Sequence, residues 1–364
     1  MALRHDPLRP AVVWTLATLA AFLLVEGLLF RTGWYNRWLE PNSSAGLVEG
    51  YLSWLAKRPG GPTAEVAVLG DSRIAHGLSA PAASAAAGNK LYFWNLGIAG
   101  TLPRDWYYML RDADPDHRRF AAIVLALDQY SDEDYEDVYA DRIIDLNFVI
   151  ARLRVSDCWE FAASMRSREN RAHALMGCLL KGIALRRDVR DLLAAWPARF
   201  ARADAWRAHG LADVNAFPGI DRDLRGLRAD WDRRILTFPP GIDAATRASI
   251  QATVMPHWPP HTGETTRYRL LWLPRIFDLY RNSPTRVILL QLPRAALPRP
   301  ESTTPPVFLS TALPRAGVVA LPGATFEDLE RPEFFFDGLH LNRAGRAIFS
   351  ERLGGRVSAL VGVR

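Results

Sequence analysis

The chain has 364 residues, enough for one large domain or two smaller ones, and 49% of them are hydrophobic, which excludes wholesale disorder. Its net charge is +6, from 45 basic and 39 acidic residues. This mildly basic balance permits contact with anionic lipid or acidic polymers. Because no basic stripe interleaved with aromatic residues is present, nucleic-acid binding is not expected.

The first element is an apolar segment at residues 11–30, "AVVWTLATLAAFLLVEGLLF", which carries one charge, Glu26. Twenty helical residues span about 30 Å, the thickness of a bilayer core. Arg4 and Arg9 precede the segment, so the positive-inside rule predicts a cytoplasmic N-terminus and a periplasmic or otherwise extracytoplasmic bulk. We therefore expect a single-pass inner-membrane protein with an anchor over residues 1–35.

Two other interpretations of this segment stay open, a cleaved signal peptide and a buried helix of a soluble protein. The following residues, "LLFRTGWYNRW", contain no small-x-small cleavage site, which favours the uncleaved anchor. Glu26 is costly in lipid and is expected to face a partner helix.

Five short apolar runs with helix-compatible segments between several of them predict the fold. Alternating strands and helices are typical of an α/β protein whose parallel sheet is covered on both faces, a three-layer α/β/α sandwich. Active sites in such sheets lie beyond the carboxyl ends of the strands. The five runs are residues 64–70, 91–97, 120–130, 286–293 and, more weakly, 317–323.

The third and fourth runs are separated by a long insertion, residues 131–284, whose apolar spacing is mostly helical. It divides the α/β domain into a first part, 36–130, and a second part, 285–364. Both cysteines of the chain, Cys158 and Cys178, lie in the insertion. Their spacing does not fit a zinc site, and no metal or cofactor is expected. Outside the cytoplasm they could form a disulfide, and the alternative is two buried free thiols.

A serine follows the first predicted strand in "VLGDSR", residues 68–73. Ser72 is placed where the chain turns into a helix, so that its hydroxyl projects from the carboxyl edge of the sheet. Backbone N–H groups at the start of that helix can stabilise an oxyanion. The alternative is that Asp71 and Ser72 only cap the helix. His76, four residues later, is expected near the hydroxyl but outside the reacting group.

Two further motifs have the residue types that such a serine needs. "NLGIAG", residues 95–100, ends in Gly100, whose N–H can approach a tetrahedral intermediate, although an ordinary turn would look the same. In "DGLHLN", His340 can take the serine proton while Asp337 fixes the tautomer of the imidazole. Alone, this pair could equally be a structural histidine and a capping aspartate. All three motifs follow predicted strands, and their occurrence together argues against a purely structural role for all of them.

These motifs together resemble the SGNH, or GDSL-type, hydrolase superfamily, over residues 64–130 and 286–360. The resemblance implies an SGNH-like sandwich in which Ser72 is the nucleophile and Asp337 and His340 complete a triad. It also implies that the N–H groups of Ser72 and Gly100 form an oxyanion hole.

The family's third oxyanion donor is an asparagine in a GxND block after the third strand. This chain has "LALDQYSD" there, in which Gln129 and Tyr130 can donate a hydrogen bond. Candidate substrate contacts in the motif loops are Arg73, Asn95, Gln129 and Tyr130.

The N-terminal anchor and the helical insertion resemble one subgroup, the bacterial proteins of alginate and peptidoglycan O-acetylation and of D-alanyl transfer to teichoic acids. That resemblance implies a membrane-bound O-acyltransferase as partner, a polysaccharide as substrate, and acyl transfer, with acetyl as the expected group. Two alternatives stay open. The same triad would serve an esterase, and the missing asparagine is compatible with a non-catalytic protein that binds glycan or anchors a complex.

Overall fold

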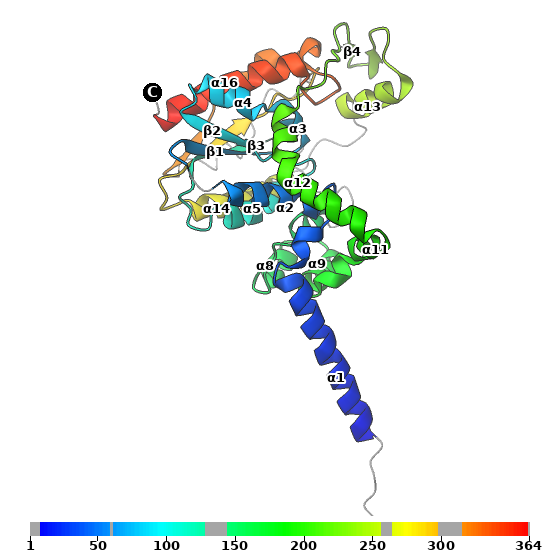
Figure 1. The fold of residues 1–364 in the computed structure, drawn as a ribbon. Coiled ribbons are helices and arrows are strands. Elements are labelled where there is room, and N and C mark those ends of the chain that lie inside the picture. Colours follow the sequence, from blue (N-terminus) through cyan, green and yellow to red (C-terminus); the bar gives the residue numbers. More distant parts are fainter. Residues whose placement is uncertain (1–7, 59–60, 128–143, 256–263, 298–314, 363–364) are drawn as a thin grey trace, which may run out of the picture. The chain divides into compact units, whose positions relative to one another are not determined.

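The computed structural model describes residues 8–58, 61–127, 144–255, 264–297 and 315–362 (Figure 1). The chain forms two compact units. The helical unit comprises Met1–Gly50 and Ala140–Ala208, and the sheet unit comprises Tyr51–Tyr139 and His209–Arg364. The predicted insertion, residues 131–284, is therefore divided: residues 140–208 belong to the helical unit and its two ends belong to the sheet unit.

The sheet unit contains five parallel strands in the order β2-β1-β3-β6-β7, which confirms the five apolar runs as strands. From β1 the chain moves outward to β2 and then crosses back to β3 on the other side of β1. Ligands bind preferentially at such a switch point, beyond the carboxyl ends of the strands. The strands are β1 (Ala64–Leu69), β2 (Leu91–Asn95), β3 (Phe120–Leu127), β6 (Arg286–Gln291) and β7 (Val318–Ala320).

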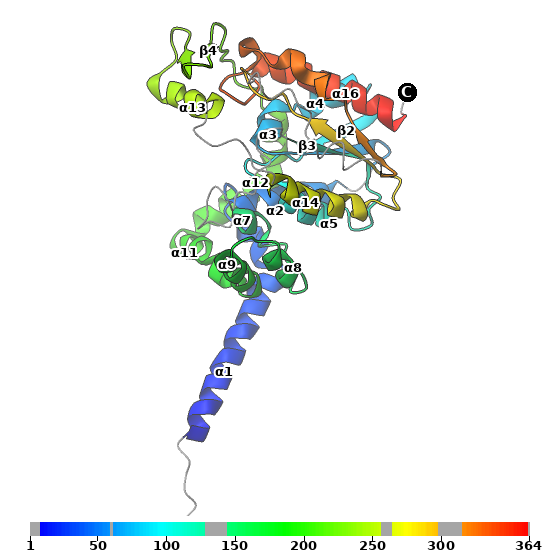
Figure 2. The same cartoon turned by 180° about the vertical axis from the view of Figure 1, so that it is seen from behind.

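Helices cover both faces of this sheet, so the three-layer α/β arrangement is confirmed (Figures 1 and 2). The helix α16 packs on α3 and α4 over one face, and α5 packs with α14 over the other. These elements are α3 (Ser72–Gly77), α4 (Ala80–Ala86), α5 (Pro103–Ala113), α14 (Glu264–Leu279), η4 (Gly323–Leu329), η5 (Pro332–Phe334) and α16 (Arg343–Val361).

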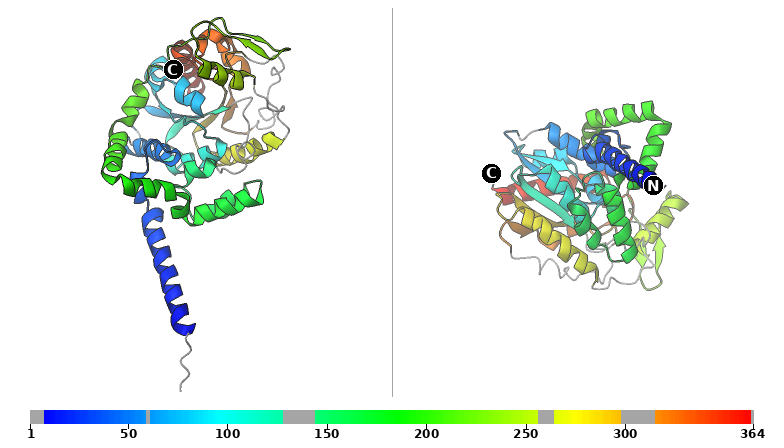
Figure 3. Two further views of the ribbon diagram at one scale, coloured as in Figure 1. Left: turned by 90° about the vertical axis from the view of Figure 1, so that its right-hand side faces the viewer. Right: turned by 90° about the horizontal axis from the view of Figure 1, so that it is seen from below.

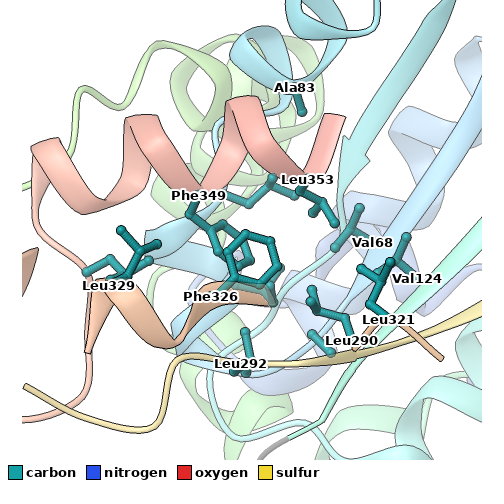
Figure 4. Close-up of a cluster of buried hydrophobic side chains, with 14 of the residues drawn as sticks. Val68, Ala83, Val124, Leu290, Leu292, Leu321, Phe326, Leu329, Phe349 and Leu353 are labelled. Atoms are coloured by element: carbon teal, nitrogen blue, oxygen red, sulfur yellow. The ribbon is translucent and has the colours of Figure 1, made fainter. Parts of the chain in front are cut away.

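The core under α16 is formed by alternate residues of the strands, because successive side chains of a strand point to opposite faces. Val68, Val124 and Leu290 meet Phe326 of η4 and Phe349 of α16 there (Figure 4). The two phenylalanine rings lie 4.6 Å apart between centroids. Burying each such side chain stabilises the fold by about 1.5–3 kcal/mol, which fixes the strand ends that carry the site.

Part of the predicted helical insertion forms strands instead. The antiparallel pair β4 (Arg228–Asp230) and β5 (Ile235–Thr237) precedes α13 (Ala244–Val254). Leu224, Leu227 and Leu236 are buried in the same core as the parallel sheet. Burial of these leucines against the sheet unit, which helical periodicity does not reveal, explains why this segment belongs to that unit.

The helical unit begins with α1 (Leu8–Glu26), which continues through one wider turn, η1 (Gly27–Arg31). In the described part of the chain, one helix is long and apolar enough to cross a membrane, Val12–Arg31, with a mean hydropathy of 2.1. Two helices contribute residues to both units, α2 (Ser44–Lys57) and α12 (Trp196–Ala216). The remaining elements of the helical unit are η2 (Tyr35–Trp38), α7 (Ile144–Val149), α8 (Asp157–Ala163), α9 (Arg168–Leu179), α10 (Lys181–Ala184) and α11 (Arg186–Ala194).

The two cysteines form a disulfide, which decides between the alternatives that the sequence left open. Cys158 of α8 is bonded to Cys178 of α9, with their Cα atoms 5.4 Å apart. The bond closes a loop within the helical unit and holds α8 against α9.

Candidate active site

Ser72 is the first residue of α3 and follows the buried strand β1 after a two-residue turn. Asp71 is the N-cap, and its carboxylate accepts a hydrogen bond from the Arg73 N–H at 2.8 Å. The capping role that the sequence allowed for both residues therefore falls to Asp71. This leaves the Ser72 hydroxyl available for a contact outside the helix.

Asp337 and His340 lie on a tight loop that is closed by an antiparallel bridge between Phe335 and Leu341. Both bridge residues are buried, and they anchor the loop in the core. Within the loop, Asp337 Oδ1 accepts from the N–H groups of Leu339 at 2.9 Å and His340 at 2.8 Å. The local chain therefore fixes the carboxylate before it contacts any distant residue.

The structure brings together the three side chains predicted from the sequence. His340 Nε2 lies 2.8 Å from Ser72 Oγ, although the two residues are 268 positions apart. His340 Nδ1 lies 2.8 Å from Asp337 Oδ2 and 3.1 Å from Oδ1. An ionised Asp337 accepts from Nδ1–H, so Nε2 is left to accept the proton of the Ser72 hydroxyl.

The pKa of Asp337 reflects opposing influences. Burial raises the pKa of this carboxyl group. The hydrogen bond and charge of His340 lower it, as do the backbone N–H groups of Leu339 and His340. The net pKa lies below the ordinary value. Asp337 is therefore ionised at neutral pH and can stabilise an imidazolium. The side chains of His340 and Asp337 are 20% and 25% exposed, so this part of the site is partly open to solvent.

Two backbone groups were predicted to bind an oxyanion, and both lie at the carboxyl edge of the sheet, one at the start of α3 and the other in the loop after β2. The Ser72 N–H belongs to the first turn of α3, where N–H groups lack a partner within the helix. Gly100 has φ +85°, a conformation that favours glycine. Its loop is joined to the β1 end because Ile98 N–H and Thr101 Oγ1 both donate to the Gly70 carbonyl, at 3.0 and 3.1 Å.

The other predicted contacts have different surroundings. Arg73 is buried and pairs with Asp71 at 2.6 Å, which neutralises a carboxylate next to Ser72. Asn95 is also buried, and its Nδ2 donates to the carbonyls of Ile74, Ala75 and Leu78. The Asn95 amide thus holds α3 against the end of β2. Gln129 and Tyr130 lie outside the described residues, and a substrate contact for all four stays a prediction.

The packing around His340 includes one residue that the sequence analysis did not single out. Phe336 stacks on the His340 ring, with centroids 5.5 Å apart and planes 14° apart. On another side, the edge-on ring of His76 lies 5.4 Å from His340. The two rings restrict rotation of the His340 imidazole. In the sequence, Phe336 is the residue directly before Asp337, which places it near the histidine loop. His76 lies four residues after Ser72, a spacing that puts two side chains on the same face of a helix.

His76 is held neutral by its environment. Burial has the largest effect and lowers the pKa of His76 below 6.5. The charges of His340 and Arg346 lower this pKa further, and the charge of Asp337 raises it without reversing the shift. A neutral His76 adds no positive charge beside His340, so it does not oppose the formation of an imidazolium there.

We expect the His76 imidazole to titrate below pH 6.5 in the folded protein because its pKa is depressed. Its contribution to folding stability is then present above pH 6.5 and is lost as the pH falls through the folded-state pKa. The pH-dependent NMR signal of its ring C–H, assigned with His76→Gln, measures the midpoint. A midpoint at or above 6.5 would contradict the expectation, whereas Asp337→Asn should lower it further.

Comparison with protein-family models gives no match, and comparison with curated proteins gives none either. The class of protein is therefore defined by its own residues: an α/β protein with a hydrogen-bonded serine, histidine and aspartate at the carboxyl edge of a parallel sheet.

Proposed function

We propose that the protein transfers an acyl group, expected to be acetyl, to a hydroxyl of a cell-surface or exported polysaccharide through an acyl-Ser72 intermediate. The observation that carries this proposal is the continuous hydrogen-bonded chain from Ser72 Oγ through His340 to Asp337. A serine hydroxyl is a poor nucleophile at neutral pH, and an adjacent imidazole held by a carboxylate is the arrangement that activates it.

In the first half-reaction, Ser72 Oγ attacks the carbonyl carbon of the acyl donor while His340 Nε2 takes the hydroxyl proton. The ionised Asp337 stabilises the imidazolium that forms. The N–H groups of Ser72 and Gly100 are the proposed donors to the negative oxygen of the tetrahedral intermediate. When the donor's leaving group departs, it takes the proton from His340 and leaves an acyl ester on Ser72.

In the second half-reaction, a sugar hydroxyl attacks this ester. His340 accepts the proton of that hydroxyl and returns it to Ser72 Oγ as the serine leaves, so the product is an O-acylated sugar. The enzyme is regenerated without a metal or cofactor taking part in either proposed step. Water in place of the sugar would give a free acid, the esterase outcome.

The proposed location and partner have separate support. The apolar helix Val12–Arg31 is preceded by basic residues, as in a single-pass protein with an extracytoplasmic bulk. The disulfide Cys158–Cys178 is of a kind that persists in oxidising compartments outside the cytoplasm. These features and the motifs support the resemblance to membrane-anchored SGNH-type proteins of cell-surface acylation. We infer from that resemblance that a membrane-bound O-acyltransferase supplies the acyl group.

The proposal is tested with the purified full-length protein in detergent micelles, given an activated acetyl ester and a panel of neutral, uronic-acid and amino-sugar oligosaccharides. We expect mass spectrometry to detect an acetylated oligosaccharide that forms only with an intact Ser72. Free acetate without any acetylated sugar would identify an esterase. Absence of both products, together with absence of acyl-Ser72, would favour the non-catalytic interpretation.

A further inference from the structure

The end of the N-terminal apolar helix is bonded to the last residues of α9 and to α10. Both carboxylate oxygens of Glu26 accept from the Gly182 N–H at 3.1 Å. Arg31 donates to the carbonyl of Leu179 at 2.9 Å and to that of Cys178. A Cβ on Gly182 would lie 2.7 Å from Glu26 Oε2 and 3.0 Å from the Phe30 ring, so the contact has no room for a side chain.

These contacts fix the depth of α10 relative to the apolar helix. Glu26 lies five residues before the end of Val12–Arg31, which corresponds to about 7–8 Å at the helical rise. Its side chain slants toward the helix N-terminus and so reaches further into the span. If the helix crosses a membrane, as the proposed function requires, Gly182 lies within the layer of about 5–10 Å that interfacial segments occupy.

The side chains around this level are arranged as lipid would require. The Lys181 side chain is buried, and Nζ donates to the Ala151 carbonyl at 2.9 Å. Burial lowers the pKa of Lys181 to about 8. Glu26, Arg31 and Lys181 thus each make a hydrogen bond inside the protein, through Nη2 in the case of Arg31, as is needed where water is scarce; Arg31 Nη1 is buried without a partner among the described residues.

Several large apolar side chains of the same region are exposed, interspersed with exposed charged residues such as Arg154, Glu160 and Arg171. Trp159 of α8 is 76% exposed, and Leu28, Val155, Met176 and Leu179 are exposed as well. The disulfide Cys158–Cys178 brings Trp159 and Leu179, each the residue after a half-cystine, to the same end of the α8–α9 pair. In the helical unit, α8 and α9 gather around the end of α1 (Figures 1 and 3). Tryptophan at such a level is typical of membrane interfaces.

We propose that residues 150–184, the interfacial segment, rest in the lipid headgroup layer beside the membrane helix, with Trp159, Met176 and Leu179 inserted among the lipids. The inference rests on the membrane anchor of the proposed function and adds a second contact with the bilayer. A single helix leaves its domain free to tilt, whereas two contacts joined by Glu26 and Arg31 fix the tilt of the helical unit. The exposed arginines Arg186 and Arg187 of the following helix match anionic headgroups.

The test uses the full-length protein, labelled with 5-fluorotryptophan and reconstituted in nanodiscs of anionic lipid. Fluorine NMR resonances are assigned by their loss in Trp159→Phe, Trp14→Phe and Trp94→Phe. Trp159→Phe is a mild change because the side chain is largely exposed. A lipid with a nitroxide near its headgroup, or a water-soluble gadolinium chelate, is then added to broaden the resonances of nearby residues.

We expect the lipid nitroxide to abolish the Trp159 signal and the aqueous reagent to leave it largely intact. Trp94, which is buried in the sheet core, is the control that neither reagent should broaden. Broadening of Trp159 by the aqueous reagent alone would overturn the proposal and leave the surface to a protein partner. Trp14 is exposed on the membrane helix and distinguishes failure of the interfacial proposal from failure of the membrane anchor. If the lipid nitroxide does not broaden the Trp14 signal, the anchor itself is refuted.

Discussion

Replacing Ser72 with alanine is expected to lower acyl transfer by about 10⁴-fold or more, because the proposed mechanism forms the acyl ester on this hydroxyl. The hydroxyl contacts His340 Nε2, and the helix cap is supplied by Asp71, so α3 should keep its structure. Steady-state transfer with an activated acetyl ester and labelling by a fluorophosphonate probe measure the effect. The wild-type protein should be labelled at Ser72 and the variant should not.

The matched control for this variant is Ser249→Ala, on the exposed surface of α13. It removes the same hydroxyl from a helix of the same unit and should leave both transfer and labelling unchanged. Thermal unfolding of the three proteins shows whether Ser72→Ala is folded. A folded Ser72→Ala protein with wild-type transfer would exclude the acyl-serine mechanism.

Asp337→Asn is expected to reduce the rate of acylation by about 10⁴-fold, the size of effect known for an aspartate that sets the tautomer of a catalytic histidine. The asparagine oxygen can still accept from the N–H groups of Leu339 and His340, so the loop should remain folded. Its amide N–H₂ then points at His340 Nδ1 and requires that atom to be an acceptor. The ring proton moves to Nε2, where it faces Ser72 Oγ and prevents the histidine from acting as a base.

The burst of product from a single turnover measures this step, because it isolates acylation from release. Glu333→Gln is the matched control, since it neutralises a nearby carboxylate that pairs with Arg331 rather than with His340. The control should retain the wild-type rate. A loss of less than about tenfold in Asp337→Asn would indicate that Asp337 only caps its loop.

Local patterns determined much of the fold and of the candidate site. Each of the five strands was visible as an apolar run, because strands buried on both faces are continuously apolar. The DxxH spacing placed a carboxylate beside an imidazole within one loop, a contact that needs no tertiary information. The prediction that residues 131–284 are mostly helical, in contrast, missed β4 and β5, since such short strands have too little pattern to detect.

By itself, the sequence therefore determined the apolar N-terminal helix, the strands, and which residue types end them. The tertiary structure alone decided that Ser72 reaches His340 across 268 positions, that Asp71 takes the helix cap, and that Cys158 and Cys178 are bonded. It also placed Phe336 and His76 against the His340 ring and joined Glu26 to Gly182. The physical reason is one of range: hydrophobic periodicity and turn chemistry act within a few residues, whereas contacts between distant segments depend on how the packed core brings their ends together.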